Sequence, residues 1–132
     1  MRRASAAVFR FCADNHVRNH PRWDPDIELE PVSEGAMGVG TVIRRRNTRS
    51  GTPVEGTMEI VEYERDQAMG GVIREGPVET RGRMTFDAVD ENRTRLTLSA
   101  EIPGVDESAA ARIRSLMQRS ADNIKRLVES ET

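Results

Sequence analysis

Residues 79–102 read ETRGRMTFDAVDENRTRLTLSAEI, and this stretch indicates two antiparallel strands joined by a tight turn. Apolar residues alternate with polar ones on both sides of the turn, at Met84 and Phe86 and then at Leu96, Leu98, Ala100 and Ile102. A period of two is typical of strands that bury one face and expose the other. Residues 90–92 (DEN) supply the turn between them. We therefore predict a hairpin with one apolar face.

A long amphipathic helix is predicted directly after this hairpin. Pro103 and Gly104 end the second strand, and Asp106 is placed to cap a helix of roughly 24 residues. Apolar side chains then recur at helical spacing, at Ala109, Ile113, Leu116, Met117, Ile124, Leu127 and Val128. We expect Ile113, Met117 and Ile124 to be buried against the sheet, near Met58, Met84 and Leu98.

Four further segments with strand character precede the hairpin, at residues 27–30, 39–46, 54–65 and 67–74. Gly70 and Gly71 indicate a bulge or bend in the last of these. Residues 6 to about 15 predict a short helix, and Pro21 disfavours helix at His20. The predicted fold class is α+β, with a curved antiparallel sheet of about six strands gripping the long C-terminal helix, and a short N-terminal helix, in a single domain of residues 1–132.

Composition and charge exclude several classes of protein. The chain has 132 residues, with 20 Lys and Arg against 22 Asp and Glu, so its formal net charge is −2. This balance argues against a dedicated nucleic-acid binder. The single Cys12 excludes an internal disulfide, and the sequence contains neither a signal-peptide pattern nor an apolar run long enough to span a membrane. We expect a cytoplasmic protein that is not integral to a membrane.

The order of these elements resembles the helix-grip fold of the polyketide cyclase/dehydrase and lipid-transfer superfamily, which includes START domains and birch-pollen-allergen-like proteins. Residues 8–14 (VFRFCAD) and 20–25 (HPRWDP) resemble its first helix and the Trp-containing turn. Residues 38–41, 94–97 and 123–127 resemble the start of its third strand, its last strand and its last helical turn. The resemblance implies a cavity between helix and sheet that holds an apolar ligand, without naming the ligand or requiring catalysis.

The resemblance also implies a strand ahead of the first helix, lying inside the sheet. Residues 1–7 show no alternating apolar pattern, so residues 27–32 and 94–102 are expected to form unpaired edges. Three explanations stay open: the true start lies upstream, a partner chain pairs with an edge, or the sheet closes imperfectly. Because exposed edges invite pairing between chains, we expect a homodimer.

An apolar ligand cavity is the predicted site. Its expected lining comes from the sheet, the Trp-containing turn and the last helix: Trp23, Met58, Ile60, Met69, Met84, Phe86, Ile113 and Met117. Methionine is adaptable and polarizable, which suits a lipid-like or polyketide-like guest. The alternative is that these side chains simply fill the core. The leading function is binding or transport of a hydrophobic small molecule such as a lipid, quinone or polyketide, without a cofactor.

Two other functions stay open. A polyketide aromatase/cyclase or dehydratase would need converging polar residues in the cavity, and no residue stands out as a general base, so no catalytic residue is predicted. A toxin or regulator that binds a protein or a ribosome would use the basic hairpin of Arg44, Arg45, Arg46 and Arg49, which we otherwise expect to be a solvated tip.

Cys12, His16 and His20 are spaced at intervals of four residues, as zinc ligands on a helix can be. Because Pro21 is expected to end the helix before His20, and no fourth ligand is evident, a metal site is not expected. The preferred interpretation is a buried, apolar Cys12 with histidines that are solvated or that stabilise a turn.

Overall fold

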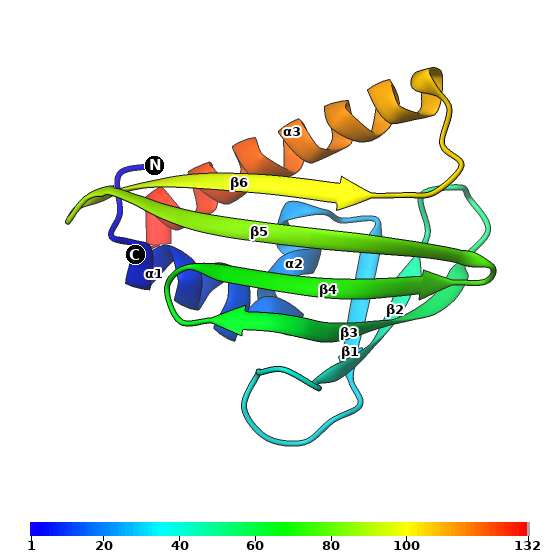
Figure 1. The fold of residues 1–132 in the computed structure, drawn as a ribbon, viewed down its shortest axis with the longest axis horizontal. Coiled ribbons are helices and arrows are strands. Elements are labelled where there is room, and N and C mark those ends of the chain that lie inside the picture. The colour runs from blue at the N-terminus through cyan, green and yellow to red at the C-terminus, as the bar shows by residue number, and fades with distance from the viewer. Residues whose placement is uncertain (132) are drawn as a thin grey trace.

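The computed structural model describes residues 1–131, and Figure 1 shows one curved sheet with helices against it. The six strands are antiparallel and follow the chain in the order β1-β2-β3-β4-β5-β6. They are β1 (Ile27–Pro31), β2 (Val42–Asn47), β3 (Val54–Glu64), β4 (Ala68–Glu75), β5 (Val78–Asp90) and β6 (Arg93–Glu101). The helices are α1 (Ser5–Phe9), the π-helical η1 (Arg10–Asp14), α2 (His16–Trp23) and α3 (Glu107–Glu131). The predicted fold class is confirmed.

The hairpin that decided the fold is β5–β6. Met84 lies opposite Leu98 and Phe86 opposite Leu96, so the apolar sets of both strands share one face, as the alternation predicted. Phe86 is 2% exposed and forms edge-to-face contact with Phe9 of α1 at 5.2 Å between ring centroids. The first helix therefore covers this end of the sheet.

Helix α3 begins where its cap was predicted. The backbone N–H of Ala109 donates to Oδ1 of Asp106 at 2.8 Å, which satisfies one of the otherwise unpaired donors of the first turn. At its other end α3 meets the N-terminal segments, because Asn123 Nδ2 donates to the carbonyl of Trp23 at 3.1 Å and Arg22 bonds to Glu131. The C-terminal half of α3 is thus held against α2.

Replacing Asp106 by alanine is expected to lower the free energy of unfolding by about 1 kcal/mol, because the cap bond to Ala109 is lost. Denaturant titration measures the change. Ser115→Ala, an exposed substitution in the interior of the same helix, serves as the control and should not lower stability, because alanine is the better helix former. Equal stabilities of Asp106→Ala and Ser115→Ala would contradict the cap.

The N-terminal helical region differs from the prediction. A single helix to about residue 15, ended by Pro21, was expected, whereas a π-helical turn at Arg10–Asp14 leads into a second helix that contains Pro21. The inner face of α2 buries His16, Asn19 and Trp23, and this burial outweighs the one backbone hydrogen bond that proline cannot donate. The prediction that helix ends before His20 is therefore wrong.

A β-bulge lies between Ile60 and Glu62 of β3, opposite Gly70 and Gly71. The sequence placed the irregularity at these two glycines, on the partner strand. The bulge leaves Val61 46% exposed and changes the phase of β3, so that both Ile60 and Tyr63 reach the inner face. Strand β2 also starts later than expected, at Val42 rather than residue 39, because residues 38–41 form a turn in which Gly40 has φ +92°.

The two edges of the sheet are β1 and β6, as the sequence predicted. The N-terminal residues pair locally with the start of β6: the amino group of Met1 donates to the carbonyl of Thr94 at 2.6 Å, and Thr94 N–H donates to the carbonyl of Met1 at 2.9 Å. The pairing of two copies through the sheet edges stays a prediction.

Candidate ligand cavity

A cavity of about 270 Å³ lies between the inner face of the sheet and the N-terminal half of α3, with α2 at one end. Its volume is near the lower end of the range for small-molecule sites. The apolar part of the wall comes from α2, four strands, the segment that follows β6, and α3: Trp23, Met58, Met69, Ile73, Met84, Leu98, Ile102, Ile113, Leu116 and Met117. The arrangement offers a largely apolar chamber to a guest molecule.

Six of the eight residues predicted for the site line this cavity, namely Trp23, Met58, Met69, Met84, Ile113 and Met117. Ile60 and Phe86 do not. Both belong to the closed core, where Ile60 is 0% and Phe86 2% exposed. Strand alternation places a residue on the inner face of a sheet, but it does not show which part of that face a helix covers.

The two halves of α3 have different environments. Ile124 and Val128 in the C-terminal half are 0% exposed, whereas Ile113 and Met117 in the N-terminal half are only half-buried. The expectation that Ile113 and Met117 are buried is therefore wrong, and the reason is the cavity that both residues line. The N-terminal half of α3 forms a wall of the chamber rather than part of the closed core.

Gly71 makes room for one of the methionines. A Cβ atom at this position would lie 2.8 Å from Cε of Met58 and 3.3 Å from the backbone oxygen of Glu59. The Met58 side chain therefore lies over the bare backbone of β4, at the floor of the cavity.

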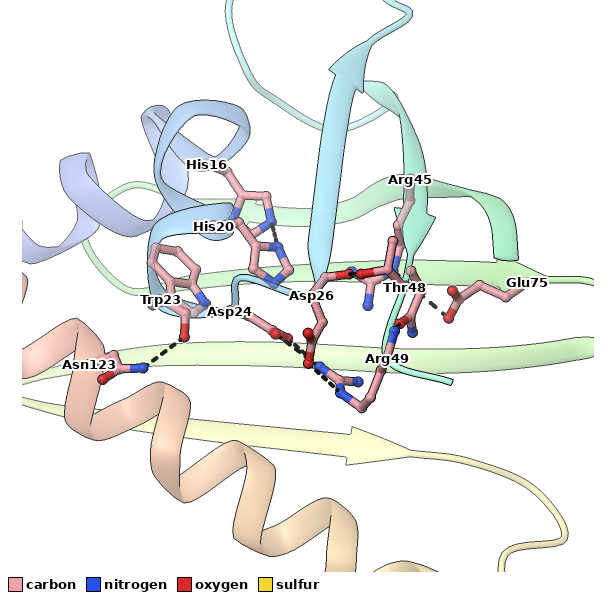
Figure 2. A network of polar contacts seen from close by, with 11 residues as sticks. His16, His20, Trp23, Asp24, Asp26, Arg45, Thr48, Arg49, Glu75 and Asn123 are labelled. Atoms are coloured by element: carbon pink, nitrogen blue, oxygen red, sulfur yellow. Dashed lines mark hydrogen bonds and ion pairs between the residues drawn. The ribbon is translucent and has the colours of Figure 1, made fainter. Parts of the chain in front are cut away.

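The end of the cavity at α2 is polar, and its first feature is a chain of two histidines (Figure 2). Nδ1 of His16 lies 2.9 Å from the carbonyl of Cys12, and Nδ1 of His20 lies 3.0 Å from Nε2 of His16. A carbonyl only accepts, so Nδ1 of His16 carries the proton and its Nε2 accepts from Nδ1–H of His20. Nε2 of His20 is then left as an acceptor beside the cavity.

Burial keeps both imidazoles neutral. Desolvation lowers the pKa of His16 to about 4, although the hydrogen bond to the Cys12 carbonyl opposes this and the positive charge of Arg45 adds to it. Desolvation also lowers the pKa of His20 well below its ordinary value, with further contributions from His16, Arg45 and Arg49. The expectation that the histidines are solvated is wrong for His16, which is 2% exposed.

An acidic and basic pair closes the same end of the cavity. Arg49 Nη2 donates to both carboxylate oxygens of Asp24, at 2.9 and 2.7 Å, and Arg49 Nε lies 3.4 Å from Asp26 (Figure 2). His20 stacks on Trp23, with ring centroids 5.1 Å apart and planes inclined by 22°. These contacts fix α2 and the turn after it against β2 and the loop that follows it.

Arg45 occupies an unexpected position. It was predicted to be part of a solvated tip, but it is only 8% exposed and lines the cavity. Its Nε lies 3.9 Å from Oε1 of Glu75, the last residue of β4. The sequence carried the signal, because Ile43 and Arg45 share one phase of β2 while Arg44 and Arg46 share the other.

The other arginines of this hairpin lie among acidic residues. Arg44 pairs with Glu30 at 3.4 Å, and Arg46 lies 3.6 Å from both Glu28 and Glu55. Such exposed pairs add little to stability, but they neutralise the local charge. Within residues 1–131, these pairs offset the positive charge of Arg44 and Arg46 that a nucleic-acid or ribosome contact would use.

Cys12 does not join the histidines as a ligand. Its thiol is fully buried, and desolvation raises its pKa far above the ordinary value. Among residues 1–131, no group of three or more His, Cys, Asp or Glu side chains is placed to hold a metal ion. That the protein acts without a metal or cofactor stays a prediction.

A curved antiparallel sheet that grips a long C-terminal helix around an internal cavity defines the helix-grip class. A family model described as "Polyketide cyclase / dehydrase and lipid transport" matches residues 2–129, and the chain belongs to this family. A comparison with curated proteins found no match. Within residues 1–131, no helix is both long and apolar enough to cross a membrane.

Solved structures agree with this fold. A START superfamily protein from Mycobacterium smegmatis superposes with a TM-score of 0.79 at 11% identity, covering 100% of this chain and 94% of that one. Ara h 8.0201 gives 0.77 at 16% identity, covering 98% and 92%. The Zhui aromatase/cyclase from Streptomyces sp. R1128 gives 0.70 at 16% identity, covering 98% and 87%. At these identities the likeness concerns the fold.

Proposed function

We propose that this protein binds or transports a hydrophobic small molecule, such as a lipid, a quinone or a polyketide-like compound, in the cavity between sheet and α3. The observation that carries the proposal is the chamber of about 270 Å³, whose apolar wall includes Met58, Met84 and Met117. Methionine side chains adapt to guests of irregular shape. The family description, which includes lipid transport, supports the same function.

Uptake of an environment-sensitive apolar dye tests this proposal. The wild-type protein is expected to bind the dye saturably and to release it to quinones or fatty acids. Met117→Glu should abolish uptake, because a carboxylate without a partner in an apolar chamber is costly to desolvate. Met117→Trp should do the same by filling the space.

Ser115→Glu, which adds the same charge to an exposed position of α3, is the matched control and should bind the dye like the wild type. Far-UV circular dichroism establishes that all three variants fold. Absence of saturable uptake by the wild type, or unchanged uptake by both Met117 variants, would overturn the proposal.

A second candidate function is that of a polyketide aromatase/cyclase or dehydratase, favoured by the buried histidine chain. Nε2 of His20 is an acceptor at the cavity wall, in position to take a proton from a carbon next to a carbonyl. Arg45 on the same wall would stabilise the negative charge of the resulting enolate. The matching family description and the Zhui aromatase/cyclase fold support this alternative.

Hydrogen–deuterium exchange next to the carbonyl of a bound aromatic ketone, followed by NMR, tests this second function. The wild-type protein should accelerate exchange, and His20→Gln should remove the acceleration while it retains dye binding. If wild type and His20→Gln exchange at the same rate, the protein binds its guest without enolising it.

We also propose, from the sequence, that the protein is cytoplasmic, consists of a single domain and forms a homodimer.

A further inference from the structure

Arg45 is a buried group whose hydrogen bonding is incomplete. Its side chain is 9% exposed, and neither Nε nor Nη1 has a hydrogen-bond partner among residues 1–131. The distance of 3.9 Å to Glu75 is too long for a hydrogen bond. Buried N–H groups of this kind are costly unless an acceptor reaches them, and Arg45 lies on the wall of the cavity.

Within the part of the chain that the structure describes, Glu75 lacks a hydrogen-bond donor, just as Arg45 lacks acceptors. Its side chain is 19% exposed, and its Oε2 is buried without a hydrogen-bond partner among residues 1–131. An ionised carboxylate only accepts hydrogen bonds, whereas a guanidinium only donates them. The two side chains therefore offer a donor and an acceptor next to each other at one end of an apolar chamber.

The charges of Arg45 and Glu75 cancel within this pair. Arg49, the other arginine at this end, already donates to both oxygens of Asp24 and lies beside Asp26. No excess of positive charge remains to favour an anionic guest over a neutral one. A guest that satisfies both side chains must bring an acceptor oxygen and a hydroxyl donor, and it does not need a charge.

We propose that the ligand is a neutral hydroxy-ketone on an apolar skeleton, with its carbonyl oxygen accepting from Arg45 and its hydroxyl donating to Glu75. This inference rests on the proposed function and narrows its class of ligand. Quinones lack a donor for Glu75, and hydrocarbon chains lack both groups. Leaving a buried polar group unpaired discriminates more strongly than a change of apolar shape does.

Three bicyclic ketones of similar shape test this assignment by competition with the apolar dye. In 7-hydroxy-1-tetralone the hydroxyl is too far from the carbonyl to bond to it internally, 7-methoxy-1-tetralone lacks the donor, and 1-tetralone lacks the substituent. The wild-type protein is expected to bind the hydroxy compound at least tenfold more tightly than either of the others.

Substitutions assign each contact. Glu75→Met should reduce the affinity for the hydroxy-ketone to that for the methoxy-ketone, whereas Arg45→Met should weaken binding of all three ketones. The double variant Arg45→Met/Glu75→Met leaves no unpaired buried charge and should bind all three equally. Arg46→Met and Glu79→Met, at exposed positions of β2 and β5, are the matched controls and should bind like the wild type.

The outcomes separate this inference from the proposed function. If the dye binds saturably but the three tetralones compete equally for the wild-type protein, the hydroxy-ketone assignment is overturned and the binding function stands. A preference for the hydroxy compound that persists in Glu75→Met would also overturn the assignment. If no dye binds, both the assignment and the proposed function fail.

Discussion

Ile124→Ala is expected to lower the free energy of unfolding by roughly 3 kcal/mol. Ile124 is 0% exposed and belongs to the core with Phe9, Ile43 and Val128. The substitution removes three methyl or methylene carbons, and the surrounding side chains come from helices and strands that pack against one another, so the space left behind collapses only in part. Urea titration of both proteins gives the difference.

Ile113→Ala is the matched substitution on the same helix, about three turns earlier, and it should cost less than about 1 kcal/mol. Ile113 is half-buried and already faces the cavity, so truncation enlarges an existing space instead of opening a new one. A loss for Ile124→Ala below about half a kcal/mol, or equal losses at the two positions, would show that α3 is not divided into a packed half and a cavity-lining half.

The strands and α3 were predictable because their signals are local. The alternation over residues 79–102 predicts one apolar face of the hairpin, and the helical spacing after Asp106 predicts one apolar face of the helix. The structure confirms β5, β6 and α3 within a few residues of the expected bounds. The second helix was missed because Pro21 is a strong local breaker, and the burial of His16 and Trp23 that overrides it is a tertiary effect. Register shifts such as the bulge before Glu62 were visible only as a glycine pair on the neighbouring strand.

The polar end of the cavity was not predictable from local sequence pattern. Arg45 was grouped with its neighbours as a charged tip, although its strand phase matched that of the buried Ile43. That prediction gave more weight to the preference of arginine for solvent than to the alternation of the strand. In the structure, Arg45 follows the alternation and is buried. The spacing of His16 and His20 raised only the question of whether they bind a metal. In the structure, His16 bonds to a backbone carbonyl and the two histidines bond to each other. Local pattern identifies an inner face, but the pairing of buried polar groups depends on contacts between distant segments.

The neutral histidine pair predicts how stability depends on pH. The pKa of His16 is about 4 in the folded protein, against an ordinary value of 6.5, and that of His20 is lowered in the same direction. The unfolded chain therefore binds protons between pH 6.5 and pH 4 that the folded protein does not bind. Stability is fully present above pH 6.5 and is lost as the pH falls through this window.

Between pH 7 and pH 4.5, the lowered pKa of His16 alone is expected to reduce the free energy of unfolding by roughly 2–3 kcal/mol, since a fully depressed histidine contributes up to about 1.4 kcal/mol per pH unit. The lowered pKa of His20 adds to this loss. Carboxylates such as Asp14 and Glu129, whose pKa values are lowered by their hydrogen bonds, add to the loss mainly at lower pH. The comparison with His16→Gln isolates the contribution of His16 to the pH dependence, because the carboxylates titrate alike in both proteins. The variant, although less stable at pH 7, should show a shallower dependence above pH 4.5. Parallel curves for the two proteins, or an NMR titration in which both imidazoles gain a proton near pH 6.5, would refute the buried neutral pair and with it the acceptor role of His20.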